Sequence, residues 1–347
     1  MRSDTFWGRA GVRLARVDFL TVDEQATAVN LYYQGRCDVL VQNHMPVTFL
    51  PVLAGETKGV TTRAKRDYHR TPLLQAYFYL INTKQLDNVH LRRALSHALD
   101  RSELPLITKG GLIASSAYVP GRPIKDLTDA ELALCGVTRE TRGVAMIVVA
   151  GEVCYVPPLG PDFDLAAARR EWELARSEMG AKFPARLSVK YNTGVEQHKL
   201  IGEWVQEQWR KNLGIPVDLE SQDWQIFIAA TRDRDYQIAR FGGSAAFVDP
   251  ENFLRNWLCE HPDNRPGWCN PQYEALFQQA ERESDRNKRL ALLRQAEALM
   301  VAEQPIIPMA IYTQHHLIKP YVKGFDLNLV DHQSLRNAWI DPDWRSR

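Results

Sequence analysis

Three predicted strands in the second half of the chain end in residues that could contact a ligand. His198 falls in the first turn of a predicted helix, and Trp224 comes just past a predicted strand. A third strand candidate, residues 236–241, runs into the small residues Gly242-Gly243-Ser244-Ala245-Ala246. An indole can form an apolar wall, and small residues let the backbone of a ligand come close. This combination favours a binding site over a catalytic one.

No motif supports an enzyme. The sequence contains no G-x-S-x-G, H-E-x-x-H, P-loop or G-x-G-x-x-G pattern. His315 and His316 are adjacent, so in a strand they would point to opposite faces and could not hold one metal ion together. Asp233 and Asp235 alternate with arginines, which is typical of a solvated turn. We therefore predict no catalytic residue, no metal site and no cofactor, and we keep a hydrolase acting on a small solute as an alternative.

The candidate residues are positioned by a predicted strand–helix–strand unit. Residues 187–192 alternate apolar and polar side chains, as in a half-buried strand. Thr193 and Glu196 have the spacing of a capping box that would begin a helix, which Gly214 would end. Residues 215–219 begin a second strand, and such a short connection implies parallel strands whose exits share one edge of the sheet. One face of the helix is apolar, at positions Leu200, Ile201, Trp204, Val205, Trp209 and Leu213.

Composition limits the remaining classes. The chain has 347 residues, enough for two lobes with separate cores, and 45% of them are hydrophobic. A formal net charge of +1 gives no reason to expect binding to nucleic acid or to a membrane surface. No run of about 20 apolar residues could cross a membrane. The first 20 residues also lack the apolar segment and cleavage site of a signal peptide.

The cysteines leave the compartment open. Cys259 and Cys269 flank a loop rich in Pro, Gly and Asn, CEHPDNRPGWC. They could close as a disulfide in an oxidising compartment or remain free thiols. Together with His261 they could also hold zinc, although the spacing fits no common ligand pattern.

Several segments carry a family resemblance. They are YNTGVEQHKLIGEWVQEQWRKNLGIPVDLESQDWQIF, DYQIARFGGSAAFVDPENFL, INTKQLDNVHLRRALSHALDR, RLALLRQAEALMVAEQPIIPMAIYTQHHLIKPYVKGF and FWGRAGVRLARVDFLTV. Together these segments cover most of the chain and follow one another along it in the family's order, so the chain resembles the oligopeptide- and dipeptide-binding proteins of ABC importers, the family 5 extracytoplasmic solute-binding proteins. The resemblance implies an α/β, two-lobed periplasmic-binding-protein-like fold (type II, cluster C-like) that lacks its N-terminal portion.

The same resemblance implies an organisation and a function. Residues 1–76 would form part of a first lobe, residues 77–313 a second lobe with hinge strands near 76–82 and 306–313, and residues 314–347 a return to the first lobe. The chain would be a periplasmic or extracytoplasmic monomer that captures peptides or similar small solutes between the lobes. Its partner would be the transmembrane permease of the importer. A truncated remnant that pairs with a separate chain is another alternative.

Candidate ligand-binding residues follow from the resemblance, position by position. They are Tyr79, His198, Trp224, Ile228, Arg240, Gly242, Gly243, Ser244, Ala246 and Tyr312, with Tyr77 as a further possible cleft residue. Arg240 could meet a ligand carboxylate with two hydrogen bonds, or pair with a local acid such as Asp235. Trp224 could be a wall of the site or part of the core, and His198 could contact ligand or be a surface or capping histidine.

One position departs from the family pattern. Oligopeptide binders carry an aspartate after the small-residue turn, where it holds the free amine of the peptide, and this chain has Ala246 there. By the same alignment Asp249 does not replace it. A buried ammonium without a partner is costly, so we expect weak or no preference for free N-termini.

Overall fold

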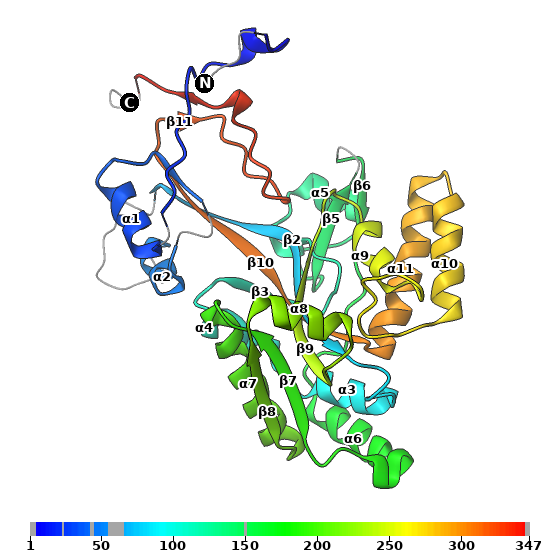
Figure 1. Ribbon diagram of the computed structural model, residues 1–347. Helices are drawn as coiled ribbons and strands as arrows, with labels where there is room; N and C mark the ends of the chain where they lie inside the picture. Colours follow the sequence, from blue (N-terminus) through cyan, green and yellow to red (C-terminus); the bar gives the residue numbers. More distant parts are fainter. Residues whose placement is uncertain (1–4, 23, 42–44, 55–65, 149–150, 344–347) are drawn as a thin grey trace. The chain divides into compact units, whose positions relative to one another are not determined.

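The chain divides into two compact units. The structure, a computed structural model, describes residues 5–22, 24–41, 45–54, 66–148 and 151–343 (Figure 1). Unit 1 comprises Met1–Leu73, Lys109–Gly111 and Thr313–Arg347, and unit 2 comprises Leu74–Thr108 and Leu112–Tyr312. Two long strands, β2 (Tyr68–Ile81) and β10 (Ile306–Ile318), have residues in both units.

Unit 1 has a small core built around α1. Its elements are α1 (Gln25–Tyr33), β1 (Val39–Leu40), α2 (Leu50–Leu53), β11 (Val322–Lys323) and β12 (Trp339–Ile340), with the ends of β2 and β10. Glu24 caps α1 by accepting hydrogen bonds from the backbone amides of Ala26 and Thr27. The sequence of residues 12–20 predicts a strand, but this prediction is wrong, because the segment forms neither strand nor helix. Its apolar side chains have no sheet to pack on, and Phe19 is 85% exposed.

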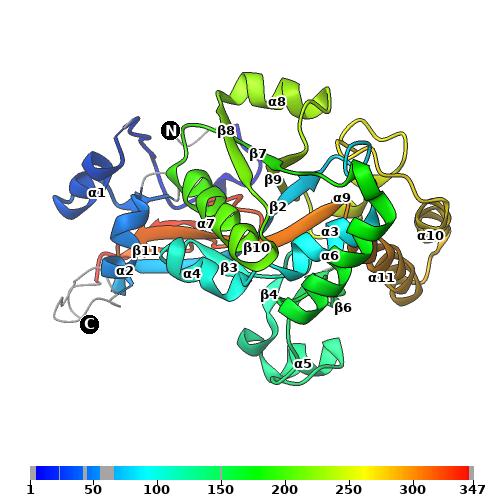
Figure 2. The same cartoon turned by 90° about the horizontal axis from the view of Figure 1, so that it is seen from below.

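Unit 2 contains most of the secondary structure. Its helices are α3 (Val89–His97), α4 (Leu104–Ile107), α5 (Asp129–Cys135), α6 (Leu165–Met179), α7 (Glu196–Leu213), α8 (Trp224–Arg232), α9 (Glu251–Leu254), α10 (Pro271–Arg282) and α11 (Arg286–Glu303). Its further strands are β3 (Leu112–Ala114), β4 (Arg122–Pro123), β5 (Val144–Val148), β6 (Val153–Tyr155), β7 (Leu187–Asn192), β8 (Val217–Gln222) and β9 (Ile238–Ser244). Two of the helix pairs, α3 with α6 and α10 with α11, lie side by side (Figures 1 and 2).

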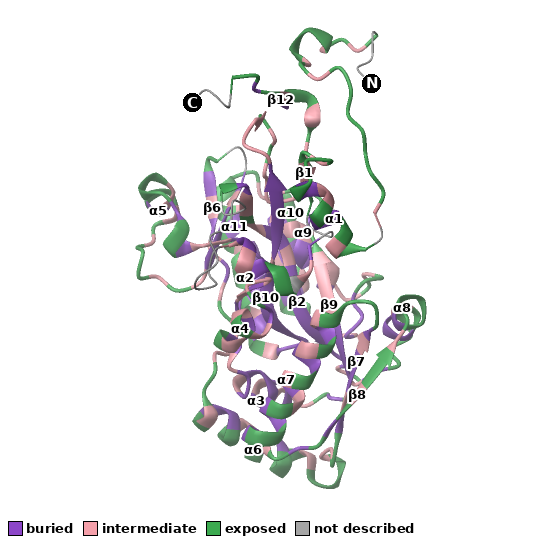
Figure 3. Ribbon diagram, turned by 90° about the vertical axis from the view of Figure 1, so that its left-hand side faces the viewer, coloured by how far each residue is buried: buried purple, intermediate pink, exposed green. Residues whose placement is uncertain are grey.

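The main sheet of unit 2 confirms the predicted parallel unit. Its strand order is β10-β2-β9-β7-β8, and β3 pairs with β10. β7 runs parallel to β8 from the pair Leu187–Val217 to the pair Asn192–Gln222. β9 runs parallel to β7 and antiparallel to β2. Figure 3 shows β7 buried and β8 largely exposed, as expected for a strand at the edge of a sheet.

Helix α7 packs its predicted apolar face on this sheet. Ile201, Val205 and Trp209 are fully buried in the same hydrophobic cluster as Leu187 and Val189 of β7. The Trp209 indole N–H donates to the carbonyl oxygen of Leu95 at 2.8 Å, which satisfies its one polar atom. Gly214 ends the helix with a positive φ of 73°, a conformation that glycine adopts without strain.

The capping box predicted for α7 does not form. The helix begins at Glu196 after Val195, without a side-chain cap. The Thr193 hydroxyl instead donates to Asp223 at 3.1 Å, and the Thr193 amide donates to the carbonyl oxygen of Gln222 at 2.8 Å. Thr193 therefore links the end of β7 to the end of β8 by hydrogen bonds, and its hydroxyl is not available to cap α7.

A buried acid links α11 to two other segments of unit 2. Glu297 is fully buried; one of its oxygens accepts the Val119 amide at 2.9 Å, and the other accepts the Tyr155 hydroxyl. Burial raises the pKa of Glu297 from 4.5 to about 7, although the hydrogen bonds from Tyr155 and Val119 oppose the rise. The folded state therefore holds a proton that the unfolded state releases near pH 4.5.

This proton makes stability depend on pH. Because the folded pKa of Glu297 lies above its unfolded value, its contribution is fully present below pH 4.5 and is lost as pH rises toward 7. We expect Glu297→Gln to flatten this slope, removing roughly 3 kcal/mol of the pH dependence between pH 4.5 and 7. Denaturant unfolding at several pH values measures it. Glu173→Gln, on the exposed face of α6, should keep the wild-type slope, and parallel slopes for Glu297→Gln and wild type would refute the assignment.

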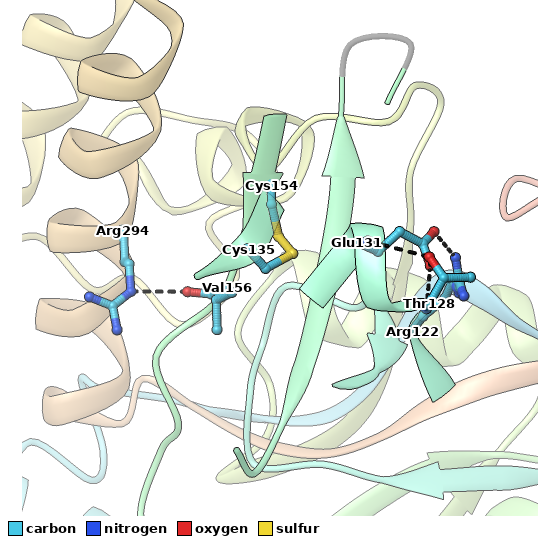
Figure 4. Close-up of a disulfide and its surroundings, with 7 residues drawn as sticks. All are labelled: Arg122, Thr128, Glu131, Cys135, Cys154, Val156 and Arg294. Atoms are coloured by element: carbon cyan, nitrogen blue, oxygen red, sulfur yellow. Dashed lines mark hydrogen bonds and ion pairs between the residues drawn. A yellow bond between two sulfur atoms is a disulfide. The ribbon is translucent and has the colours of Figure 1, made fainter. Parts of the chain in front are cut away.

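Two disulfides lie in unit 2. Cys259 and Cys269 are bridged, with a Cα–Cα distance of 4.7 Å, so the disulfide alternative was right for this pair. A second bridge, between Cys135 and Cys154, was not predicted (Figure 4). It joins α5 to β6 beside the capping box of Thr128 and Glu131. The sequence separation of 19 residues gave no local signal for it.

Candidate functional site

The predicted ligand residues lie at the carboxyl end of the parallel strands in unit 2. β7 and β8 end together at Asn192 and Gln222, and β9 continues past them to Ser244. His198 is in the first turn of α7, directly after β7, and Trp224 is the first residue of α8, directly after β8. Because β9 lies next to β7, Arg240 is brought beside Asn192. The topology therefore gathers these segments as predicted.

Arg240 is a buried cation without a carboxylate partner among the described residues. It is 8% exposed. Its guanidinium donates to Asn192 Oδ1 at 3.1 Å and to the Tyr312 hydroxyl at 2.6 Å, and it lies 5.2 Å from the centre of the Tyr77 ring. The predicted alternative, an ion pair with Asp235, is wrong, because Asp235 accepts Lys190 instead.

Four buried polar atoms around this arginine make no hydrogen bond of good geometry with a described residue, although Arg240 lies close enough to Tyr77, and Tyr77 to Tyr79, to oppose the rise in the pKa of each tyrosine. They are Arg240 Nε, the hydroxyls of Tyr77 and Tyr79, and His198 Nδ1. The rings are close together: Tyr77 lies 5.7 Å from His198, 6.2 Å from Tyr79 and 5.6 Å from Tyr312, centre to centre. Buried polar atoms nearly always have a hydrogen-bond partner. Four such atoms without a well-placed one, close together, therefore indicate a place for a ligand or an ordered water. We call Tyr77, Tyr79, His198, Arg240 and Tyr312 the arginine cluster.

The electrostatics of the arginine cluster favour an anion. Burial, and then the nearby Arg240 charge, lower the pKa of His198 to about 2, so its imidazole is neutral. Burial raises the pKa of Tyr79 and Tyr77 above 10, so both hydroxyls keep their protons. A neutral imidazole and protonated phenols can all donate hydrogen bonds. The cluster thus presents one positive charge and several donors, which suits a carboxylate.

His198 is not a surface residue, contrary to one of its two predicted roles. Its side chain is 3% exposed and packs against Tyr77. Trp224 is not a core residue, because it remains 49% exposed and stacks on Phe227. Ile228 lies farther along α8 and is half-buried.

The small residues 242–246 begin in β9, beside β2, and continue into the turn that follows β9. Gly242 and Gly243 pair with Tyr77 and Ala76 of β2. A Cβ on Gly242 would lie 3.3 Å from the Ala76 carbonyl oxygen and 3.5 Å from the Tyr312 ring, so a side chain there would push on the arginine cluster. Ser244 is exposed at the end of β9.

The turn after β9 is held by residues outside the predicted set. The amides of Ala246 and Phe247 donate to Asn252 Oδ1 at 2.7 and 3.3 Å. Asp249 forms a two-bond ion pair with Arg289 of α11, at 2.8 and 3.0 Å. Asn192, which accepts a hydrogen bond from Arg240, was also missed by the sequence analysis. Its position at the end of a predicted strand was the available signal, but the partner, Arg240, is 48 residues away in sequence.

His315 and His316 lie in β10, where His315 bonds to the hydroxyls of Tyr68 and Thr313. Within the described ranges, no group of three or more His, Cys, Asp or Glu residues is arranged to hold a metal ion. No helix in the described part of the chain is both long and apolar enough to span a membrane. A pocket of about 290 Å³ near Arg186 and Lys190 has charged lining residues that are already ion-paired with one another.

Comparisons with known proteins identify the family. A model described as bacterial extracellular solute-binding proteins, family 5 middle, matches residues 1–264. The oligopeptide-binding protein OppA of Bacillus subtilis is 29% identical over 98% of this chain and 57% of its own length. A probable deoxycholate-binding periplasmic protein, YgiS of Escherichia coli, is 26% identical over 91% of this chain and 52% of its own length.

Solved structures of peptide-binding proteins have a similar fold. The unliganded open form of the periplasmic murein tripeptide-binding protein MppA superposes with a TM-score of 0.72 at 25% identity, covering 96% of this chain and 59% of that one. An oligopeptide-binding protein of Borrelia burgdorferi gives 0.69 at 26% identity, covering 96% and 60%. The chain therefore spans a little over half the length of these relatives. It belongs to family 5 of the bacterial extracellular solute-binding proteins.

Proposed function

We propose that this chain captures a peptide or similar small solute for an ABC importer, and that the arginine cluster receives the carboxylate of the solute. The observation that carries the proposal is the buried Arg240, which has no ion-pair partner among the described residues and is surrounded by polar groups that make no hydrogen bond of good geometry. A carboxylate placed there would satisfy the guanidinium and at least two further groups. Charge-assisted hydrogen bonds of this kind are about twice as strong as neutral ones.

The names of the relatives support this class of function. The two relatives cited above are named as binding proteins, not as enzymes. In two-lobed receptors a solute is held when the lobes close, so that affinity comes from contacts made only in the closed state. Here β2 and β10 would be the crossings, near residues 76–82 and 306–313, and the permease subunits would receive the closed form.

We also place the protein outside the cytoplasm. Unit 2 carries two disulfides, and such bonds persist in oxidising compartments. Periplasmic relatives agree with this location. A self-sufficient receptor should elute as a compact monomer in size-exclusion chromatography, whereas a chain that needs a separate partner would elute as a complex or aggregate.

Native mass spectrometry of the purified chain tests the function. We expect a co-purifying small molecule that is released unchanged by denaturation. Conversion of that molecule by the protein would indicate a hydrolase instead. If no solute co-purifies and titration with carboxylate peptides gives no heat of binding, the proposal is wrong.

Trp224 should contribute apolar contact to the same solute. Its indole is half exposed at the end of β8, so its removal should cost little stability. We expect Trp224→Ala to weaken binding roughly tenfold and to change the free energy of unfolding by less than about 0.5 kcal/mol. Calorimetric titration with the co-purified solute measures the first effect. Leu106→Ala, another exposed apolar position in unit 2, should leave binding unchanged, and an equal loss in both variants would contradict the role of Trp224.

A further inference from the structure

The segment that follows β9 offers no free negative charge to a ligand. Residues 242–247 contain no Asp or Glu. The next two acids, Asp249 and Glu251, are both held by Arg289: its guanidinium bonds Asp249 at 2.8 and 3.0 Å and Glu251 at 2.5 Å. Arg255 also pairs with Glu251. Both carboxylates are therefore neutralised within the protein.

The backbone of the same turn is also occupied. Asn252 Oδ1 accepts the amides of Ala246 and Phe247, so the turn is closed on itself. Arg289 comes from α11 and fixes the residues just after this turn, so it acts as a positioning residue. Its side chain is 22% exposed and that of Asp249 is 14% exposed, which places the pair mostly out of water.

Apolar side chains near the strand ends remain exposed. On α8, Trp224 is 49% and Ile226 58% exposed, and Phe247 after β9 is 53% exposed. Val195, between β7 and α7, is 45% exposed. These exposed apolar groups follow the ends of β7, β8 and β9, the strand ends at which the buried Arg240 bonds Asn192, and this arrangement indicates a ligand with one charged end and an apolar body.

Other acids near these strand ends have local roles. Asp223 accepts the Thr193 hydroxyl at 3.1 Å. Glu196 is exposed in the first turn of α7, where a negative charge is stabilised by the helix dipole. Because the Glu196 side chain is exposed, water already solvates its carboxylate, and an ion pair between Glu196 and the ammonium group of a ligand would be weak.

We propose, on the basis of the proposed function, that the solute is a small organic anion with an apolar body and no positive charge at its far end. N-acylated peptides and amphiphilic carboxylic acids share this chemistry. A peptide with a free amine fits poorly, since burying its ammonium near Phe247 would leave it without a counter-charge. Arg289 enforces this specificity by keeping Asp249 and Glu251 engaged.

Calorimetric titration of the chain with four probes tests the proposal. Acetyl-Leu-Leu carries only the carboxylate, Leu-Leu adds the free amine, acetyl-Leu-Leu-amide has no charge, and decanoate is an amphiphilic acid. We expect acetyl-Leu-Leu to bind at least roughly tenfold more tightly than either Leu-Leu or the amide. Comparing it with decanoate distinguishes a blocked peptide from a simple carboxylic acid as the natural class.

The outcomes separate the two proposals. If Leu-Leu binds as tightly as acetyl-Leu-Leu, the far end does accept an amine and this inference is wrong, while the solute-binding function stands. If Glu196→Gln selectively weakens Leu-Leu, Glu196 is the amine site and the inference is equally wrong. If none of the four probes binds at millimolar concentration, the proposed function itself fails, and this inference fails with it.

Two variants test the role of Arg289 and of the turn. Ala246→Asp adds a carboxylate to the turn, and Arg289→Gln releases Asp249. Each variant should raise the affinity for Leu-Leu, relative to the affinity for acetyl-Leu-Leu, by roughly tenfold. Arg286→Gln removes an arginine of the same helix that pairs with Glu152, and it should not change this ratio. An unchanged ratio in Ala246→Asp and Arg289→Gln, with both variants folded by circular dichroism, would overturn the proposal.

Discussion

Replacing Arg240 by methionine is expected to weaken solute binding by about a hundredfold and to raise the stability of the unliganded protein. The loss of affinity, roughly 3 kcal/mol, follows from removing a buried cation that we propose meets the carboxylate of the solute. The gain in stability follows because this guanidinium is 8% exposed and its burial is offset only by hydrogen bonds to Asn192 and Tyr312 and by the Tyr77 ring, with no carboxylate partner among the described residues. A buried charge without a counter-charge is costly, and an apolar side chain of similar length removes that cost.

Arg240→Met should lower affinity and raise stability, and these opposite signs make the test specific. Affinity is measured by calorimetric titration with acetyl-Leu-Leu, and stability by denaturant unfolding without ligand. Arg92→Met is a matched control, because Arg92 is also buried in unit 2 but donates to the carbonyl oxygens of Leu86, Asp87 and Glu303. That change should lower stability and leave the intrinsic affinity intact. If Arg240→Met destabilises the protein as much as Arg92→Met does, Arg240 is a structural residue and not a binding residue.

Removing the Cys135–Cys154 bridge is expected to destabilise unit 2 by roughly 3 kcal/mol. The bridge closes a loop of 19 residues and joins α5 to the three-stranded sheet of β4, β5 and β6 (Figure 4). The core of this segment is small, built on Ile124, Leu127, Leu132 and Ala145, so the segment depends on the cross-link. Cutting the bridge therefore frees a chain that little apolar burial would otherwise hold.

Denaturant unfolding of the double variant Cys135→Ser and Cys154→Ser measures this effect. Cys37→Ser is the control, because Cys37 is the free cysteine, and it should unfold close to wild type. The pair Cys259→Ser and Cys269→Ser should cost slightly less, since its loop of 10 residues is shorter. Equal stability of wild type and the Cys135→Ser, Cys154→Ser variant would show that the bridge adds nothing to the native state.

Local sequence patterns were sufficient for the elements that carry the site. The alternation in residues 187–192 and the apolar stripe of α7 predicted a strand and a helix that the structure has, because both patterns record which face each element buries. The parallel β7–β8 pair followed from the short connection between them. The strand predicted at residues 12–20 is wrong, because a local pattern does not supply a neighbouring strand to pair with.

The arginine cluster depended on tertiary structure. Family resemblance singled out Tyr79, His198, Arg240 and Tyr312, but only the sheet order brings β2, β9 and β10 together so that their side chains meet. The sequence also offered Asp235 as the partner of Arg240, whereas the fold gives Asp235 to Lys190 and gives Arg240 to Asn192 and Tyr312. Charge pairing depends on distances of a few ångströms, which no local pattern encodes.

What the sequence determined by itself was the family, the parallel strand–helix–strand unit and the small-residue run that lacks an acid. Each of these is written in consecutive residues, so it could be found without coordinates. Only the tertiary structure decided which buried groups stay unpartnered, that Arg289 engages Asp249 from 40 residues away, and that Cys135 meets Cys154. Those outcomes depend on which distant segments the packed cores bring into contact, and burial and pairing therefore had to be seen in the fold.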